Sequence, residues 1–312
     1  MPVDDLFRMS QTCKMMRDVV TVYWTTAFDL SRLIRPFIPG EQLASFQNML
    51  KTTAGIISGS TALQFLDRTQ YQAADLDLYI NQSHIDVASK WFLDRGARRL
   101  FNHDRARHVV DISEGYHGSG EIHHIENFEV IHSIIPRTIQ VIATYGDPVF
   151  AVLKFHSCTY AHDDGFSFFF YNNFEACVMN FITHNKAYCL YPYTTFCDRR
   201  SIVWNPAKTF AERMTANKYQ ERGWRVDHLI QLDDMMNRPT ELGVRKRWIG
   251  DSLCWIFDVQ MERATHVEKD DTIYGIVWRI QYSTFPIVSQ RGQFQQIKEA
   301  FRGEIVVSGN SR

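Results

Sequence analysis

The chain has 312 residues, of which 45% are hydrophobic and 22% are charged, and its formal net charge is −1. These values are typical of a folded protein with one or two domains, and they give no overall attraction to nucleic acid or to an anionic membrane. No apolar run reaches 18 residues, the N-terminus lacks a signal-peptide core, and the six cysteines form no CxxC pair. We therefore expect an intracellular protein, cytoplasmic or nuclear, with reduced thiols and no membrane partner.

The first predicted unit is a helical segment that covers residues 1–40. Apolar residues recur at helical spacing along it, before a Pro-Gly pair breaks the helix. The segment DLFRMSQTCKMMRDVV resembles the second half of an F-box, the helical adaptor module of ubiquitin ligases, with Leu6, Met9 and Cys13 at the usual apolar positions. The first half of that module, with its Leu-Pro start, is absent. This difference argues against a ubiquitin-ligase scaffold as a partner and favours a helical cap packed on the next domain.

The predicted core, residues 41–160, is an α/β (α+β) unit in which helices flank a mixed β-sheet. In its central stretch an apolar run meets Gly59 and Ser60, a helical pattern follows, and a second apolar run carries Asp75 and Asp77. We interpret this stretch as a strand, a Gly-Ser turn, a helix and a strand with two carboxylates. The other predicted elements are helices over residues 41–51 and 83–94, strands over residues 99–101, 109–112, 128–135 and 138–143, and an element over residues 149–155.

Residues 161–312 are predicted to form a C-terminal helical and mixed subdomain that closes a cleft over the core. Its predicted elements are a buried helix over residues 175–183, a helix over residues 215–226, strands over residues 248–262 and 272–287, and a final helix over residues 294–301. Residues 158–176 include the run FSFFFYNN, and a pyrimidine tract translates into such Phe-rich sequence. We hypothesise that this segment is a retained intron. The alternative is a surface hairpin that needs a partner.

The residues around the Gly-Ser turn suit phosphate and metal binding. Asp75 and Asp77 are two residues apart on a predicted strand, so they project from the same face, about 6–7 Å apart at the backbone. That spacing suits shared oxygen ligation of Mg²⁺. Gly59 lets a phosphate approach the backbone, Ser60 can donate its hydroxyl, and the N-terminus of the following helix is an anion site. Each half of this pattern is common alone, but both halves in this order predict a site for a metal-bound triphosphate.

This combination resembles the nucleotidyltransferase superfamily, whose members carry hG[GS], a helix and [DE]h[DE]h. The matching segments are IISGS and DLDLYI. More narrowly, the chain is similar to a group of fungal nucleotidyltransferase-like proteins through KFH, CVMNFIT, YPYTTF and KYQERGW, so the resemblance covers roughly residues 40–230. It implies a nucleotidyltransferase fold with an NTP as substrate or ligand and Mg²⁺ as cofactor. It also implies that Asp75 and Asp77 are catalytic metal ligands, while Gly59 and Ser60 bind phosphate.

Active members of the superfamily add a third carboxylate from a neighbouring strand, and it can act as general base for the attacking hydroxyl. The best candidate strand is RTIQVIAT, which carries Gln140 where an acid is expected. Glutamine can ligate through its carbonyl oxygen, but it cannot take a proton at pH 7. Two acids could substitute, Asp111 in VVDIS and Glu129 in NFEVI, and we take Glu129 as the candidate catalytic acid. If neither reaches the site, catalysis should be impaired while nucleotide binding persists.

Basic and aromatic residues supply further candidates for substrate contact. Lys218 is the predicted phosphate contact, because its helix could line the cleft. A set of arginines could bind triphosphate or an RNA backbone, or form a solvated face: Arg98, Arg99, Arg105, Arg107, Arg222 and Arg225. Tyr188, Tyr191 and Tyr193 could stack a base or pack in the core. The histidine-rich zone over residues 117–132 lacks metal-ligand spacing, and we interpret it as a solvated loop.

The sequence supports two functions. The first is Mg²⁺-dependent transfer of a nucleotidyl group from an NTP to a hydroxyl acceptor that the sequence does not identify. The second is a catalytically degenerate nucleotidyltransferase fold that acts as a nucleotide- or protein-binding module. Retention of both aspartates favours the first function. Gln140 and the truncated F-box-like start favour the second, and a protein or RNA partner is compatible with either.

Overall fold

The structure is a computed structural model that describes residues 3–71, 75–100, 122–130, 136–154, 176–202, 217–227, 230, 234–235, 241–259, 273–291 and 294–308. Several sequence predictions lie outside these ranges. Among them are the strand over residues 109–112, the candidate acid Asp111, and nearly all of the segment proposed as a retained intron, residues 158–175.

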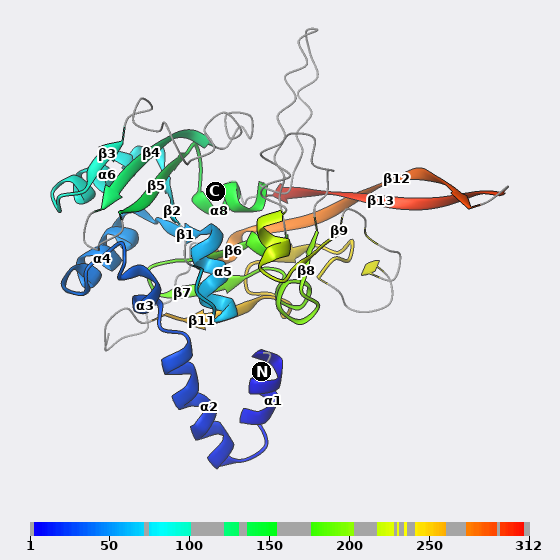
Figure 1. Ribbon diagram of the computed structural model, residues 1–312, viewed down its shortest axis with the longest axis horizontal. Helices are drawn as coiled ribbons and strands as arrows, with labels where there is room; N and C mark the ends of the chain where they lie inside the picture. Colours follow the sequence, from blue (N-terminus) through cyan, green and yellow to red (C-terminus); the bar gives the residue numbers. More distant parts are fainter. Residues whose placement is uncertain are drawn as a thin grey trace, which may run out of the picture.

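A mixed β-sheet forms the centre of the described structure (Figure 1). Its eight strands lie in the order β11-β7-β6-β1-β2-β5-β4-β3 within the described part of the chain. Their bounds are β1 Ile56–Ser58, β2 Leu76–Asn81, β3 Arg98–Leu100, β4 Ile122–Val130, β5 Arg137–Thr144, β6 Asn180–Ile182, β7 Lys186–Cys189 and β11 Trp255–Asp258. Neighbouring strands are antiparallel except for β2 and β5, which are parallel. An α/β protein with a mixed sheet flanked by helices is thus confirmed.

Helices and two smaller sheets complete the described structure. The α-helices are α1 Val3–Ser10, α2 Lys14–Ala27, α3 Leu30–Ile34, α4 Leu43–Thr53, α5 Gly59–Asp67, α6 Ile85–Leu93 and α8 Pro148–Lys154. The short helices are η1 Gly40–Gln42, η2 Gln82–His84, η4 Ala176–Val178, η5 Tyr193–Cys197 and η6 Ile273–Gly275. The smaller sheets pair β8 Arg200–Ile202 with β9 Arg225–Asp227, and β10 Arg247–Trp248 with β12 Val277–Arg291 and β13 Phe294–Ser308. No helix within the described ranges is long and apolar enough to cross a membrane.

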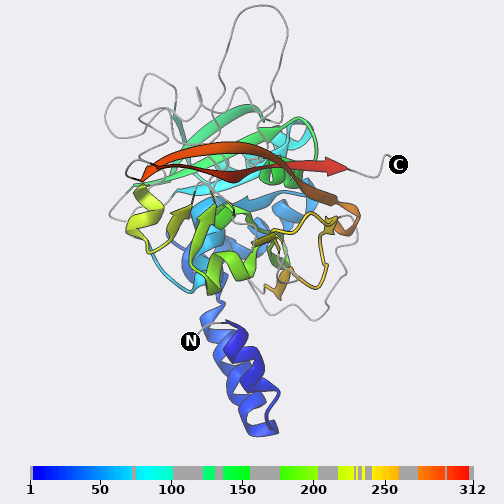
Figure 2. The same cartoon turned by 90° about the vertical axis from the view of Figure 1, so that its right-hand side faces the viewer.

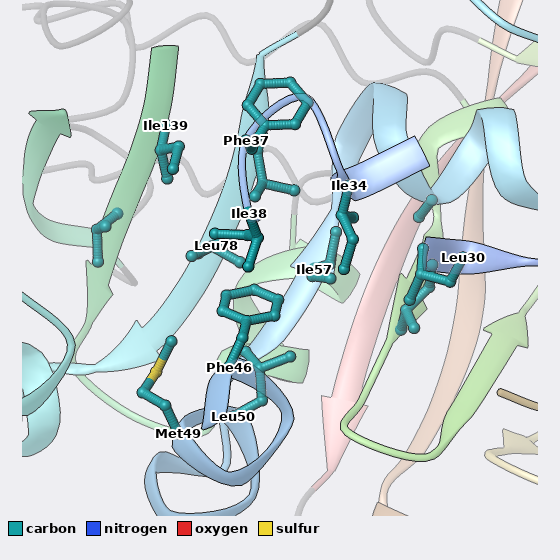
Figure 3. Close-up of a cluster of buried hydrophobic side chains, with 14 of the residues drawn as sticks. Leu30, Ile34, Phe37, Ile38, Phe46, Met49, Leu50, Ile57, Leu78 and Ile139 are labelled. Carbon is teal, nitrogen blue, oxygen red and sulfur yellow. The ribbon is translucent and has the colours of Figure 1, made fainter. Parts of the chain in front are cut away.

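The side chains of β2 alternate between two hydrophobic clusters, one on each face of the sheet. Leu76 and Leu78 are buried among residues of α3, α4 and α6 in the first cluster, part of which Figure 3 shows. Tyr79 belongs to the second cluster, together with Val152 of α8 and Trp278 of β12. Successive residues of a strand point to opposite faces. Asp77, between the two leucines, therefore lies on the face of the second cluster.

The predicted buried helix over residues 175–183 is wrong. Only η4 at its start is helical, and Asn180–Ile182 form β6, which pairs with β1 and β7. All three residues of β6 are fully buried. A short strand that is buried on both faces has no sequence period to distinguish it from a buried helix. The pairing of β6 with β1, which is distant in the sequence, and with the neighbouring β7 decides its structure.

The predicted final helix over residues 294–301 is also wrong. These residues belong to β13, which pairs with β12 along its whole length. Ile297, Phe301 and Ile305 recur every four residues, and this spacing suits one face of a helix. It also suits alternate positions of a strand, and the ladder to β12 determines which of the two forms.

Helices α1 and α2 form a hairpin that extends away from the sheet (Figures 1 and 2). Leu6 and Val20 are buried, but α2 exposes Met15, Val19 and Val22. The helix that packs against the sheet is α3, which contributes to the first hydrophobic cluster. The expected helical cap therefore corresponds to α3 together with the near end of the hairpin. Val3 of α1 belongs to the first hydrophobic cluster, and Trp24 of α2 packs against it and contacts Phe257 of β11 edge-on.

The central sheet crosses the predicted boundary at residue 160. Strands β6, β7 and β11 come from the predicted C-terminal subdomain, yet they extend the sheet beyond β1. Residues after 160 therefore build the core itself, in addition to the two smaller sheets. The segment around Lys218 packs on α5 separately, through a cluster of Leu63 with Tyr219 and Trp224.

Candidate functional site

Gly59 lies at the junction of β1 and α5, directly against the carboxylate of Asp77. Its φ of +63° lies in the left-handed region, which glycine adopts without strain. A Cβ at this position would collide with Oδ2 of Asp77. Ser58 pairs with Asp77 across the antiparallel ladder of β1 and β2, and this pairing sets the turn beside the aspartate. Both the backbone conformation and the space available therefore require glycine at position 59.

The N-terminus of α5 presents donors beside this turn. The side chain of Ser58 does not cap α5, because its Oγ donates a hydrogen bond to the backbone oxygen of Asn180 at 2.6 Å. Ser60 is buried at the second helical position, and its Oγ accepts a hydrogen bond from Nη1 of Arg222 at 3.2 Å. A hydroxyl that accepts in this way can still donate its own proton to an anion. The start of α5 thus has the properties of an anion site.

Asp75 directly precedes β2, and Asp77 is the second residue of that strand. Oγ1 of Thr61 donates a hydrogen bond to the backbone oxygen of Asp75 at 3.3 Å and so connects α5 to the start of β2. Burial raises the pKa of Asp75, and the positive charges of Lys218 and Arg137 lower it in part. Burial also raises the pKa of Asp77 to about 7, and the negative charge of Asp75 adds to that rise. A cation between these two carboxylates would relieve their repulsion.

Two cationic side chains, four residues apart, lie near the aspartates: Lys218 on a short helix over residues 217–221, and Arg222 in the turn that follows it. Arg222 stacks over Tyr71, with its guanidinium carbon 3.8 Å from the ring centroid, and the stacking restrains its position beside Ser60. Lys218 lies one helical turn earlier and is exposed, and its charge lowers the pKa of both Asp75 and Asp77. Lys218 therefore lies within electrostatic range of both carboxylates, and its role as a phosphate contact stays a prediction.

Gln140 occupies the register position beside Asp77. The parallel ladder of β2 and β5 pairs these two residues, and the antiparallel ladder of β5 and β4 pairs Gln140 with Asn127. Gln140 and Asn127 are each 4% exposed. A row of polar residues, Ser58, Asp77, Gln140 and Asn127, therefore crosses four strands of the sheet. Only Asp77 in this row is an acid.

Glu129 lies on the same face of the sheet but turns toward a different partner. It pairs with Thr138 of β5 and with Arg98 of β3, and its Oε2 accepts a hydrogen bond from Nη2 of Arg98 at 2.8 Å. Asp75 lies level with Thr138, because the residues that follow them, Leu76 of β2 and Ile139 of β5, are paired. Asp75 and Glu129 are therefore two strand spacings apart, about 9–10 Å at the backbone. The structure brings Glu129 to Arg98 and does not bring it to the aspartates.

The side-chain oxygens of Asp75, Asp77 and Gln140 suit a hard divalent cation that retains some of its water ligands. Within the described ranges, no three His, Cys, Asp or Glu side chains gather where they could hold a metal ion. Mg²⁺ is usually bound by one or two carboxylates, with waters and substrate phosphates as its other ligands. Asp75 and Asp77 match that requirement, and Gln140 offers a carbonyl oxygen beside them. The residues therefore fit Mg²⁺ together with a phosphate ligand.

Other predicted contacts have structural roles away from this site. Arg98 and Arg99 form ion pairs with Glu129 and Glu126, respectively. Tyr188 and Tyr191 are buried in the second hydrophobic cluster, whereas Tyr193 is exposed. The first two tyrosines thus pack in the core, which was the alternative to base stacking. Arg225 pairs with Asp227 on β9. Arg105, Arg107, His117 and His132 lie outside the described residues.

The histidine zone is described only in part. His123 and His124 lie on β4, with their Nδ1 atoms 2.5 Å apart. Nε2 of His124 is 3.6 Å from Oε1 of Glu126, and His123 packs against Tyr145. These residues belong to a strand, so the interpretation of the zone as a solvated loop is wrong for positions 123 and 124.

Sequence reasoning missed Arg137 and Tyr71 as parts of the site. Arg137 begins β5, and its charge lowers the pKa of Asp75. The sequence signal that could have identified Arg137 is its position three residues before Gln140 on the same predicted strand. Tyr71 follows α5 in a turn, and its backbone N–H donates to Oε1 of Gln64 at 2.6 Å. No periodicity or motif marks Tyr71, so only the fold reveals its contact with Arg222.

Comparisons with family models, with curated proteins and with solved structures found no match to this chain. The candidate site is therefore defined by its own residues and geometry.

Proposed function

We propose that this chain is a nucleotidyltransferase-like protein that binds a nucleoside triphosphate together with Mg²⁺. The observation that carries the proposal is the fit of Gly59 against Asp77, because a residue with a Cβ would displace the carboxylate from the start of α5. A metal-bound triphosphate requires an anion site that directly adjoins a pair of carboxylates able to bind the cation. The resemblance of IISGS and DLDLYI to the nucleotidyltransferase superfamily supports the same assignment.

Each residue of the site has a distinct role in this proposal. Asp75 and Asp77 would hold the cation, which when bound neutralises charge on the phosphates. Ser60 and Arg222 would donate hydrogen bonds to phosphate oxygens, and a planar guanidinium suits that contact well. Lys218 would contribute a positive charge at the exposed end of the site. Burial of the aspartates lowers the local dielectric and strengthens their attraction to the cation.

The geometry favours binding over efficient transfer. Transfer to a hydroxyl benefits from a base that takes the proton, and such a base is typically worth about 10²–10⁴ in rate. The position beside Asp77 holds Gln140, which cannot take a proton at neutral pH. Glu129 is bound to Arg98 two strands away from Asp75. We therefore infer that this is a degenerate nucleotidyltransferase fold whose function is nucleotide binding.

A binding titration tests this proposal. Each of the four NTPs would be titrated into the full chain by calorimetry, with Mg²⁺ and with EDTA. We expect binding that weakens by about tenfold or more without Mg²⁺, equivalent to about 1.4 kcal/mol. Asp77→Asn should cause the same loss in the presence of Mg²⁺. Asp86→Asn is the matched control, because Asp86 is exposed on α6. Absence of NTP binding, or binding that ignores both Mg²⁺ and Asp77, would contradict the proposal.

The retained Asp75–Asp77 pair favours a second candidate, Mg²⁺-dependent nucleotidyl transfer to a hydroxyl acceptor. Both carboxylates that would hold the reacting phosphate are present and lie together at the start of β2. A pyrophosphate-release assay with each NTP and varied hydroxyl acceptors distinguishes the two candidates. Release that depends on Mg²⁺ and is abolished by Asp75→Ala or Asp77→Ala would establish transfer. NTP binding without release would establish the binding function alone.

A further inference from the structure

Strands β12 and β13 form a two-stranded ribbon that extends past the central sheet (Figures 1 and 2). Their register runs from Val277 paired with Ser308 to Arg291 paired with Phe294, so all 15 residues of each strand are paired. Strand β10 adds to β12 only at Val277 and Trp278. Over the described ranges, no strand pairs with the other side of β13. A long ribbon with an open edge is a template for pairing with another chain.

The two outer edges of the ribbon differ in their capacity to pair. Pro286 of β12 is paired with Glu299 of β13. Proline has no N–H, so it fits a ladder where its nitrogen faces the outer edge, and it removes a donor from the outer edge of β12. β13 contains no proline. The open edge that can accept a further strand is therefore that of β13.

The position of Pro286 also determines which residues of β13 are available at that edge. In an antiparallel pair, successive residues direct their backbone groups alternately toward the partner strand and away from it. If the nitrogen of Pro286 faces outward, then its partner Glu299 also directs its N–H and C=O outward. The same holds for Phe301 and Gly303, two and four residues further on. These odd-numbered positions are the ones that can bond to a new strand.

We propose that β13 pairs in antiparallel fashion with β13 of a second copy of this chain, about a two-fold axis at Phe301. This register uses the outward-facing residues, because Glu299 bonds to Gly303 of the second copy and Phe301 meets its own equivalent. A ladder over residues 297–305 would be about 30 Å long. The result is a continuous four-stranded sheet, which removes the open edge of both copies. The proposal does not depend on nucleotide binding.

Charge and shape in the sequence of β13 select a second copy as the partner. In this register Lys298 stands opposite Glu304 of the second copy, and two-fold symmetry makes the contact twice. Both positions fall on the non-hydrogen-bonded pairs of this register, where the Cα atoms of the two strands are closest. Ile297 likewise stands opposite Ile305 of the second copy. When two copies of β13 are aligned in opposite directions, complementary residues therefore stand opposite each other. Such a strand is suited to pair with a second copy of itself.

Sedimentation velocity of the full chain over a concentration series tests this interface by charge exchange. We expect a wild-type dimer. Lys298→Glu and Glu304→Lys should each weaken dimerisation by about tenfold or more, because each places two like charges opposite each other. An equimolar mixture of the two single variants should dimerise as the wild type does, and so should the double variant. Only a contact between position 298 of one copy and position 304 of the other gives this recovery.

Two control variants accompany this test, and defined results would overturn the proposed dimer. Lys14→Glu and Glu41→Lys make the same charge changes at exposed positions away from the ribbon, and they should leave the dimer intact. A single variant that fails to fold would not recover on mixing, so recovery excludes that explanation. A wild type that remains monomeric at its highest soluble concentration would overturn the proposal. So would a dimer that ignores both charge reversals. A dimer paired about Gly303 would also overturn it, because Arg302 rather than Lys298 would then face Glu304, and only Glu304→Lys would weaken dimerisation.

Discussion

Gln140 on β5 and Asp77 on β2 are direct neighbours in a parallel ladder, and both lie on the face of the sheet that carries the candidate site. Gln140 is 4% exposed, so its amide is held in place beside the carboxylate. A neutral side chain at this point limits the repulsion among buried acids, but it leaves no group to accept a proton. The residue at position 140 therefore determines whether a third acid stands beside the two aspartates.

Replacing Gln140 by Asp should supply that proton acceptor. If transfer is limited by the missing base, pyrophosphate release from an NTP with Mg²⁺ should rise by about 10²-fold over the wild type. Asn127→Asp is the matched control, since it adds the same charge one strand further from Asp77 and should not raise the rate. Circular dichroism in the presence of Mg²⁺ would verify folding of both variants. An unchanged rate in a folded Gln140→Asp variant would show that the base is not what limits transfer.

Gly59→Ala should destabilise the protein and abolish NTP binding. The substitution forces a left-handed backbone conformation on a residue with a Cβ, and it places that Cβ against Oδ2 of Asp77. We expect the free energy of unfolding to fall by about 1–3 kcal/mol, measured by urea denaturation. Gly40→Ala is the control, because a Cβ there meets open space, and its effect should stay within about 0.5 kcal/mol. Equal effects of the two substitutions would contradict the assigned role of Gly59.

Arg222→Met should weaken NTP binding without loss of stability. The variant removes the guanidinium that lies beside Ser60 but keeps an apolar side chain against Tyr71. A hydrogen bond to a charged group is typically worth about 1.5–3 kcal/mol, so the Kd should rise about tenfold or more. Arg222→Lys should recover part of the affinity. Arg245→Met, at an exposed position, should leave the Kd unchanged, and a similar loss in that variant would indicate a non-specific charge effect.

Glu241 should make the stability of the fold depend on pH. Its carboxylate is buried and accepts hydrogen bonds from the backbone N–H groups of Tyr193 and Thr194. Burial raises its pKa to about 7, above the ordinary value of 4.5 that applies in the unfolded chain. The folded state therefore binds the proton more tightly. Its free energy of unfolding should fall as the pH rises from about 4.5 to about 7, and then stay level.

Glu241→Gln removes this titration and therefore tests it. Comparison of urea denaturation at pH 5 and pH 8 should show a smaller difference in the variant than in the wild type, by up to about 3 kcal/mol. Asp77 contributes a change of the same sign, because burial raises its pKa as well. That contribution should remain in Glu241→Gln. A pH dependence identical in the two proteins would show that Glu241 is not the source.

The fold around the Gly-Ser turn was predictable because its signals are local. The apolar run before Gly59, the helical pattern after Ser60, and the alternation around Asp77 all lie within about thirty residues of chain. The structure has β1, α5 and β2 in that order. The strand that carries Gln140 was also predicted, since Pro136 marks its start, and it is observed as β5. Period and turn chemistry suffice for such elements.

Two strands whose own residues follow a helix-like pattern were not predictable in the same way. The apolar residues in and before β6 occur at helical spacing, and Ile297, Phe301 and Ile305 of β13 recur every four positions. Neither pattern contains information about the partner strand. In both places hydrogen bonds to a partner strand select the extended conformation. The partner of β6 is the distant β1, and the partner of β13 is β12, which directly precedes it in a hairpin.

By itself, the sequence determined the residue types of the site: a glycine and serine before a helix, and two aspartates on the next strand. Only the tertiary structure decided which other side chains reach them. The parallel register of β2 with β5 brings Gln140 to Asp77, and the ladder to β3 turns Glu129 toward Arg98. Strand register and the packing of distant helices depend on the whole core, because a shift of one residue would reverse every side chain across the sheet. The glycine, the serine and the two aspartates of the site can be read from one local stretch of sequence. The residues that surround them depend on strand register and cannot be read in that way.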